Sequence, residues 1–98
     1  NTIPLSYELF QRDALIFKYL QSNSLTIIKE EKPILKVHFE DFPSLGIWTK
    51  VGAPFICIEP WFGYSDTIES TGNLFEKEGV IVLEANDTFQ AKFSIEIL

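Results

Sequence analysis

Several residue types are scarce in this sequence of 98 residues, and each scarcity excludes a class of structure. The chain contains one cysteine, Cys57, one histidine, His38, and no methionine. A single cysteine cannot form an internal disulfide, and one cysteine with one histidine cannot supply the ligands of a Cys₂His₂ zinc site. We therefore expect neither a disulfide framework nor a metal site, and a reducing, cytoplasmic setting.

Basic residues and long apolar runs are also in short supply. Eight lysines and arginines stand against 14 acidic residues, which gives a formal net charge of −6. Nucleic acids and anionic membranes select clusters of basic side chains, so neither is an expected partner. No apolar run approaches the length of a membrane span, and no signal peptide opens the chain. Because the sequence begins at Asn1 and lacks methionine, we expect it to be a processed or excised piece.

Apolar and aromatic residues, by contrast, are abundant. Hydrophobic residues make up 46% of the sequence and aromatic residues 14%, with nine phenylalanines. This composition is too rich in aromatic residues for a disordered chain, and the length allows at most one small domain.

Short runs in which apolar and polar residues alternate predict a chain made of β-strands. The predicted strands are 13–18, 25–29, 34–40, 45–49, 55–59, 80–83 and 89–97. Closely spaced strands with turn residues between them predict an all-β antiparallel sandwich without an internal domain boundary.

The segments between these strands carry recognisable turn chemistry. Residues 30–33 are expected to close an antiparallel hairpin, and Pro60 is expected to end the fifth strand. Asn86 and Asp87 predict a turn between the last two strands. Single helical turns are expected after Ser6 and within 74–77.

Glu59 is the most unusual residue in this pattern, because it is a carboxylate among apolar neighbours. Alternation places Phe55, Cys57 and Glu59 on one face of their strand. Ile56 and Ile58 fall on the other face, which should be the core face. Loss of solvent on an aromatic face penalises the carboxylate and makes it a better proton acceptor, as a general base requires. The alternative is an ordinary surface glutamate, ion-paired or solvated, and spacing alone favours that alternative.

Two tryptophans and two aspartates are further candidates for a binding site. Trp48 and Trp61 offer flat apolar surfaces on which a sugar ring can stack, although two core tryptophans are the commoner case. Trp61 follows Pro60 at a strand end, which suits a binding residue better than a core residue. Asp13 and Asp66 lie near aromatic residues at loop edges, where each can bind hydroxyl groups or cap a turn.

The two residue types most often found in catalytic sites have plainer interpretations here. His38 shares its strand face with Lys36 and Glu40, so we expect a solvent-facing histidine rather than an acid or base. Cys57 has no basic neighbour in sequence to activate its thiol, so we do not expect a nucleophile. No phosphate-binding loop and no Ser-His-Asp arrangement is available.

One block of the sequence resembles the aldose 1-epimerase, or galactose mutarotase-like, superfamily, and is closest to its LacX-like branch. The resemblance is carried by 45–50, 53–63 and Asp66, and it continues through 76–83, Phe89, 9–10 and 13–18. It thus spans nearly the whole chain, with the central block as its specific part.

The resemblance implies a role for several of the residues named above. Cys57-Ile58-Glu59 matches the family's Cys-hydrophobic-Glu motif, whose glutamate takes the proton from the C1 hydroxyl of the sugar. Asp66 matches an aspartate that follows this motif, and Asp13 matches one that binds sugar hydroxyls. Trp48 stands where other members have the tyrosine of a Tyr-Thr pair. As in the LacX-like branch, Pro60 and Trp61 follow the glutamate where other members have Thr-Gln.

The resemblance also implies that part of the site is missing from these residues. The family's catalytic histidines, one of them the acid that protonates the ring oxygen, lie earlier in the domain, and His38 does not match them. The family domain is a much longer supersandwich. Residues 1–98 therefore resemble the C-terminal portion of a single domain, with the base but without the acid.

Three functional hypotheses remain open at this point. The first is an enzyme that interconverts the anomers of an aldose or related sugar, without cofactor or metal. The second is a non-catalytic carbohydrate-binding sandwich. The third is a structural half-domain without activity of its own, whose exposed sheet edges pair with the remainder of the domain or with another chain.

Overall fold

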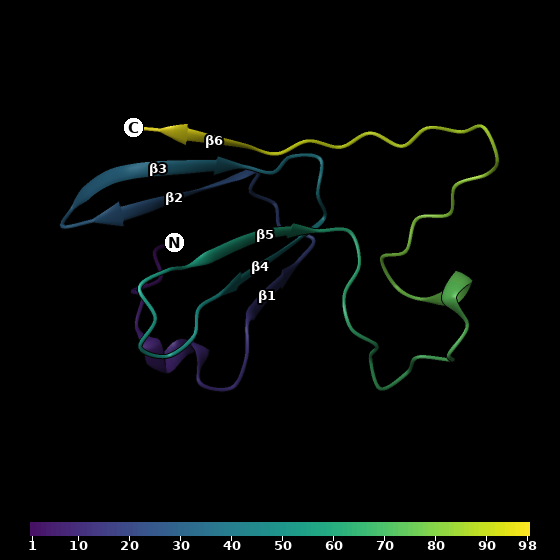
Figure 1. The fold of residues 1–98 in the computed structure, drawn as a ribbon, viewed down its shortest axis with the longest axis horizontal. Helices are drawn as coiled ribbons and strands as arrows, with labels where there is room; N and C mark the ends of the chain where they lie inside the picture. Colours follow the sequence, from purple (N-terminus) through teal and green to yellow (C-terminus); the bar gives the residue numbers. More distant parts are fainter.

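The computed structural model describes residues 1–98 and is built almost entirely of β-strands and irregular segments (Figure 1). The elements are η1 (Tyr7–Phe10), β1 (Leu15–Lys18), β2 (Ser24–Lys29), β3 (Lys32–His38), β4 (Ser44–Trp48), β5 (Cys57–Trp61), η2 (Leu74–Glu76) and β6 (Ser94–Ile97). Both helical turns expected from the sequence are present, as η1 and η2. Neither approaches the length and apolarity of a membrane-crossing helix.

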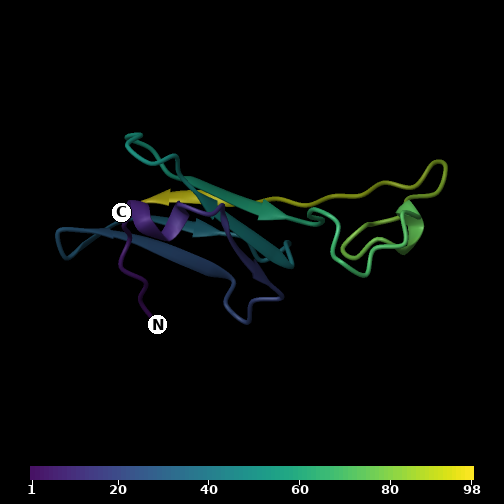
Figure 2. The ribbon, with the colours of Figure 1, turned by 90° about the horizontal axis from the view of Figure 1, so that it is seen from below.

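The strands form two antiparallel sheets of three strands each, with the orders β1-β4-β5 and β2-β3-β6. Figure 1 shows β6 beside β3 at the top, with the sheet of β5, β4 and β1 below them. The expectation of an all-β antiparallel architecture is confirmed. Figure 2 shows that the segment between β5 and β6 extends away from both sheets before the chain returns as β6.

The core lies where the two sheets face each other. Val37, Phe39 and Leu45 are each 2% exposed and form one cluster. Phe17 and Ile58 pack against this cluster while remaining partly exposed. The alternation along 34–40 therefore predicted the buried face correctly, because period-two placement sends every second side chain of a strand to the same side.

The hairpin of β2 and β3 is confirmed, but its turn is shorter than the sequence suggested. β3 begins at Lys32, so only Glu30 and Glu31 lie between the strands. Both have positive φ, 50° and 66°, which is the backbone of the tight two-residue turns that suit the twist of a hairpin. The register shifts between Ile27 and Ile28, where the strand accommodates an irregularity.

Pro60 does not end the fifth strand, contrary to expectation. It lies inside β5 and is paired with Leu45 of β4. β5 is an edge strand of its sheet, and an edge strand tolerates proline where the missing N–H would point away from the neighbouring strand.

The last two predicted strands are largely wrong. Residues 80–83 form no strand, and of 89–97 only Ser94–Ile97 does. β6 pairs with Leu35–His38 of β3. After His38 the chain turns away, and residue 92 bonds to a side chain instead of a strand: the Asp41 carboxylate accepts a hydrogen bond from the Lys92 N–H. Residues 80–83 have no strand beside them. A strand needs a hydrogen-bonding neighbour, and apolar alternation alone does not supply one.

A large apolar groove remains open between the sheets. Only seven of the 98 residues are buried, and the groove measures about 770 Å³. Its walls include Phe17, Ile47 and Ile58 from one sheet and Leu25 and Ile27 from the other. The inner faces of the two sheets are thus apolar, as in a sandwich, but they are filled only around Leu45 and its neighbours.

Candidate functional site

The pairing of β4 with β5 builds the surface that carries the candidate residues. Gly46 lies directly opposite Glu59, with Trp48 opposite Cys57 and Ser44 opposite Trp61. Side chains of directly opposed residues project to the same side of a sheet. These six residues therefore share one face, which we call the outer face. The intervening residues, among them Leu45 and Ile58, point inward to the core.

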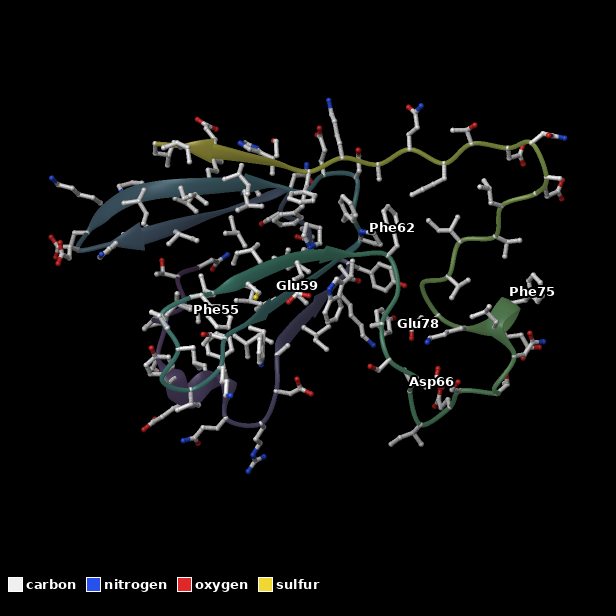
Figure 3. All side chains as sticks on the ribbon, in the orientation of Figure 1. Phe55, Glu59, Phe62, Asp66, Phe75 and Glu78 are labelled. Atoms are coloured by element: carbon white, nitrogen blue, oxygen red, sulfur yellow. The ribbon has the colours of Figure 1, made fainter.

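Sequence alternation correctly assigned the two sides of β5. Ile56 and Ile58 line the groove between the sheets, whereas Glu59 lies on the opposite side. Glu59 is half-buried, and Figure 3 shows its position on β5. The chain's two ion pairs join His38 to Glu96 and Lys77 to Asp66, so neither involves Glu59. The carboxylate is therefore not committed to a structural ion pair, which leaves it able to accept a proton.

The indole of Trp61 covers Gly46 beside Glu59. A Cβ atom placed on Gly46 would lie 2.6 Å from Trp61 Cζ2 and 2.9 Å from Cε2. Trp61 is thus the diagonal cross-strand neighbour of Gly46, and Gly46 is buried beneath it. Since Glu59 stands directly opposite Gly46, the carboxylate and the half-buried indole occupy adjoining positions on the outer face.

Trp48 and Phe55 form the neighbouring aromatic pair at the start of β5. Their ring centroids are 5.9 Å apart with an interplanar angle of 57°. The loop that joins β4 to β5 is held by the Thr49 hydroxyl, which donates to the carbonyl oxygen of Phe55. Aromatic side chains therefore lie on both sides of Glu59 along the strand, Trp48 and Phe55 toward one end and Trp61 toward the other.

The two candidate aspartates are not brought together with Glu59. The register sets Ile16 level with Gly46 and Glu59, so Asp13, which precedes β1, lies toward the Leu15 end of the sheet and two strands across from Glu59. Asp13 is exposed, and its Oδ1 accepts a hydrogen bond from the adjacent Ala14 N–H at 2.7 Å. The side chain of Asp13 therefore makes a local contact with the next residue in the sequence.

Asp66 lies beyond the opposite end of β5, on the loop that follows Phe62 (Figure 3). Its Oδ1 is 3.3 Å from Lys77 Nζ, and both residues line a polar cavity of about 180 Å³ in that loop. Glu76 and Glu78 line the same cavity. A role for Asp13 or Asp66 in binding a ligand at Glu59 stays a prediction, since they lie at opposite ends of this sheet.

The only histidine of the chain lies on the other sheet, whereas the only cysteine lies on the outer face. His38 lies on β3 of the other sheet, where its Nε2 is 2.9 Å from Glu96 Oε1 and the two side chains are 39% and 54% exposed. Cys57 is a free, half-buried thiol on the outer face, two residues from Glu59. No group of three or more His, Cys, Asp or Glu side chains is arranged to hold a metal ion.

Sequence reasoning missed three residues that shape this face. Gly46 was not singled out, although a glycine inside a strand often marks a close approach of other atoms. Lys18 and Tyr64 were also missed: Lys18 Nζ lies 4.0 Å from the centroid of the Tyr64 ring. Alternation with Ile16 places Lys18 on the outer face, whereas the position of Tyr64 depends on the path of the loop and leaves no signal in the sequence.

The hydroxyl of Tyr64 is buried and makes no hydrogen bond of good geometry. Its burial, and next the neighbouring Glu78 carboxylate, raise the pKa of Tyr64. Tyr64 therefore stays neutral throughout the physiological pH range. Its ring, with the Lys18 ammonium over it, borders the end of the outer face at which Trp61 stands, because Lys18, Ser44 and Trp61 share one register level.

Two curated proteins are similar to this chain over its whole length. They are the plasmid and chromosomal LacX proteins of Lactococcus lactis subsp. lactis, which are 35% and 36% identical over 100 aligned positions. That alignment covers 100% of this chain and 33% of each relative, so the chain spans about a third of the length of the LacX proteins. No family model matches the chain. No solved structure matches it either.

Proposed function

We propose that the protein of which these residues form part is an aldose 1-epimerase-like isomerase that interconverts the anomers of an aldose or related sugar. Three observations support the proposal. The block from Leu45 to Gly63 resembles that superfamily, and the whole chain is similar to LacX proteins. The observation that carries most weight is the outer face itself, where the Glu59 carboxylate is free of ion pairs and adjoins the indole of Trp61.

In the proposed mechanism, Glu59 accepts the proton of the C1 hydroxyl group. The electron pair released from that O–H bond forms the C1 carbonyl, and the bond between C1 and the ring oxygen breaks. The ring oxygen takes a proton from an acid, for which we propose a histidine outside residues 1–98. Rotation about the C1–C2 bond followed by the reverse steps gives the other anomer. Proton transfer alone completes this cycle, so the proposal includes no cofactor or metal.

The aromatic residues around Glu59 suit a sugar as the ligand. The C–H face of a pyranose is apolar and flat, and an indole buries such a face while leaving the hydroxyl groups at the rim free for polar contacts. Trp61 is placed to take this role beside the base. Trp48 lies opposite Cys57 on the neighbouring strand. We also propose a cytoplasmic location, because the one cysteine is a free thiol.

The test is the substitution Glu59→Gln in the full-length protein, with anomer interconversion followed by polarimetry. Loss of a general base lowers the rate by about 10²–10⁴-fold. Glu40→Gln is the matched control, because Glu40 is an exposed carboxylate that follows β3 of the second sheet. Its loss should leave the rate unchanged. A Glu59→Gln rate close to that of the unsubstituted protein would refute the assignment.

A non-catalytic carbohydrate-binding module is the second candidate. The observation in its favour is that the only histidine of the chain, His38, lies on the other sheet and is paired with Glu96, so these residues hold no acid beside Glu59. A binding module would bind sugar in calorimetry without interconverting anomers. Sequencing of the adjoining part of the protein also separates the candidates, because two histidines at the family's positions are expected only for the enzyme.

We further propose that the remainder of the same domain covers the apolar groove between the sheets. The relatives are about three times as long as this chain, and Ile28, which lines the groove on the edge strand β2, is 53% exposed. Hydrogen exchange on the full-length protein and on residues 1–98 alone tests this. Protection of β2 and β6 only in the full-length protein is expected. Equal protection in a monomeric 1–98 chain, or protection that appears only on dimerisation, would overturn the proposal.

A further inference from the structure

We propose that Gly46 is a positioning residue, which holds the Trp61 indole against the sheet beside Glu59 by offering no side chain of its own. The effect on KM that we expect rests on the proposed function, whereas the effect on the surroundings of Trp61 does not. It assigns a role in the site to a residue that contacts no substrate and acts only through Trp61.

The backbone does not explain the glycine at this position. Gly52, Gly72 and Gly79 have positive φ, where a side chain is strained, whereas Gly46 does not and is paired in register with strands on both sides. A glycine in the interior of a strand costs stability, because it loses more conformational freedom on folding than other residues and packs no side chain. A central strand position of ordinary backbone geometry would therefore be better served by a larger residue.

The indole of Trp61 does explain it. The space that a Cβ of residue 46 would need is taken by the six-membered ring of Trp61, with Cζ2 at 2.6 Å, Cε2 at 2.9 Å and Cη2 at 3.0 Å. Two carbon atoms in van der Waals contact lie about 3.5–4.0 Å apart. Even the single methyl group of alanine would thus push the ring outward by roughly 1 Å at its closest atom.

The direction of this displacement matters for Glu59. Gly46 is directly opposite Glu59, and Trp61 lies on the same edge strand two residues further along. The indole can keep its place over Gly46, next to the position of Glu59, only while the space above the glycine is free. A side chain at position 46 lifts the ring off the sheet and changes the shape of the apolar surface next to the base, without altering Glu59 itself.

The experiment uses the full-length protein with the substitution Gly46→Ala. We expect KM for the sugar to rise about 2- to 10-fold, which is the change in affinity that the loss of one aromatic packing contact produces. We expect a smaller change in kcat, because the proton acceptor is retained. The matched control is Gly63→Ala, since a Cβ at Gly63 meets only the Gly79 carbonyl oxygen at 3.8 Å, an ordinary contact. Gly63→Ala should leave both parameters unchanged.

A second measurement reports on the indole directly and needs no activity. In a Trp48→Phe background Trp61 is the only tryptophan of residues 1–98. The difference between the spectra of this protein and those of the same protein with Trp61→Phe therefore isolates the near-ultraviolet circular dichroism and the emission of Trp61. Gly46→Ala should shift both signals toward those of a more exposed indole, and Gly63→Ala should not. If the protein turned over no sugar, the proposed function would fail while this measurement still decided the role of Gly46.

A double substitution separates positioning from general damage to the sheet. In Trp61→Leu there is no indole to displace, so adding Gly46→Ala should change KM no further. Two outcomes overturn the proposal. One is a Gly46→Ala protein whose Trp61 spectra are unchanged, and the other is a loss of sugar affinity of the same size with and without Trp61.

Discussion

The carbonyl oxygen of Phe62 lies 2.5 Å from the position that a Cβ atom would take on Gly79. The backbone of Gly63 is also close, with its Cα 3.2 Å from the same point. The two ends of the long loop 63–79 therefore meet backbone against backbone, just beyond the end of β5. The Phe62 ring packs at the same place against Phe42 and Phe89, with centroid distances of 4.7 and 5.0 Å. These contacts fix the loop relative to the strand that carries Glu59.

This close approach predicts an unusually sensitive glycine. Gly79 and Gly72 have nearly the same φ, 83° and 82°, but nothing lies within 4 Å of a Cβ at Gly72. Gly72→Ala should therefore lower the free energy of unfolding by about 1–2 kcal/mol, which is the cost of placing an alanine in the left-handed backbone conformation. Gly79→Ala should cost about 1–3 kcal/mol more, because the methyl group collides with backbone atoms that cannot move independently. Urea denaturation of the two variants measures the difference, and equal destabilisation would contradict the prediction.

The small core predicts a strong dependence of stability on Leu45. This side chain is 2% exposed and lies between the sheets with Val37 and Phe39. Leu45→Ala should lower the free energy of unfolding by about 2–5 kcal/mol, the usual cost of a cavity in a packed core. Leu74→Ala is the matched control, because Leu74 is 66% exposed and its truncation should change stability by less than about 0.5 kcal/mol. Similar midpoints for the two variants in denaturant would show that Leu45 is not a core residue.

The raised pKa of Tyr64 predicts a loss of stability at alkaline pH. The native state holds the phenolic proton more tightly than the unfolded chain, in which tyrosine ionises near pH 10. Below that pH both states are protonated and the stabilisation is fully present. As pH rises above about 10 the unfolded state loses its proton first, so stability falls progressively.

Absorbance at 295 nm and unfolding midpoints between pH 8 and 12 check this behaviour. The last tyrosine to titrate should be absent from Tyr64→Phe. That variant should also lose stability less steeply with pH than the unsubstituted protein. An unchanged slope in Tyr64→Phe would assign the alkaline sensitivity to other groups.

Local alternation predicted the fold best where a strand has a partner close in sequence. The β2–β3 hairpin and the buried face of 34–40 followed directly from the pattern, as did the assignment of Ile58 to the inner side of β5. Alternation failed at Pro60, where the outcome depends on β5 being an edge strand, and at 80–83 and 89–93, where no neighbouring strand is present. In each failure the missing information is which strand lies alongside, and that is a long-range property of the chain.

The candidate site divides in the same way. The sequence by itself determined that Glu59 is a carboxylate in an apolar strand and that Cys57 shares its face, because side chains alternate with a period of two. Only the tertiary structure decided that Gly46 stands opposite Glu59, that Trp61 lies over this glycine, and that Asp13 and Asp66 lie at opposite ends of the sheet. These relationships depend on the register between strands, which pairing across the sheet sets and the spacing within one strand does not encode.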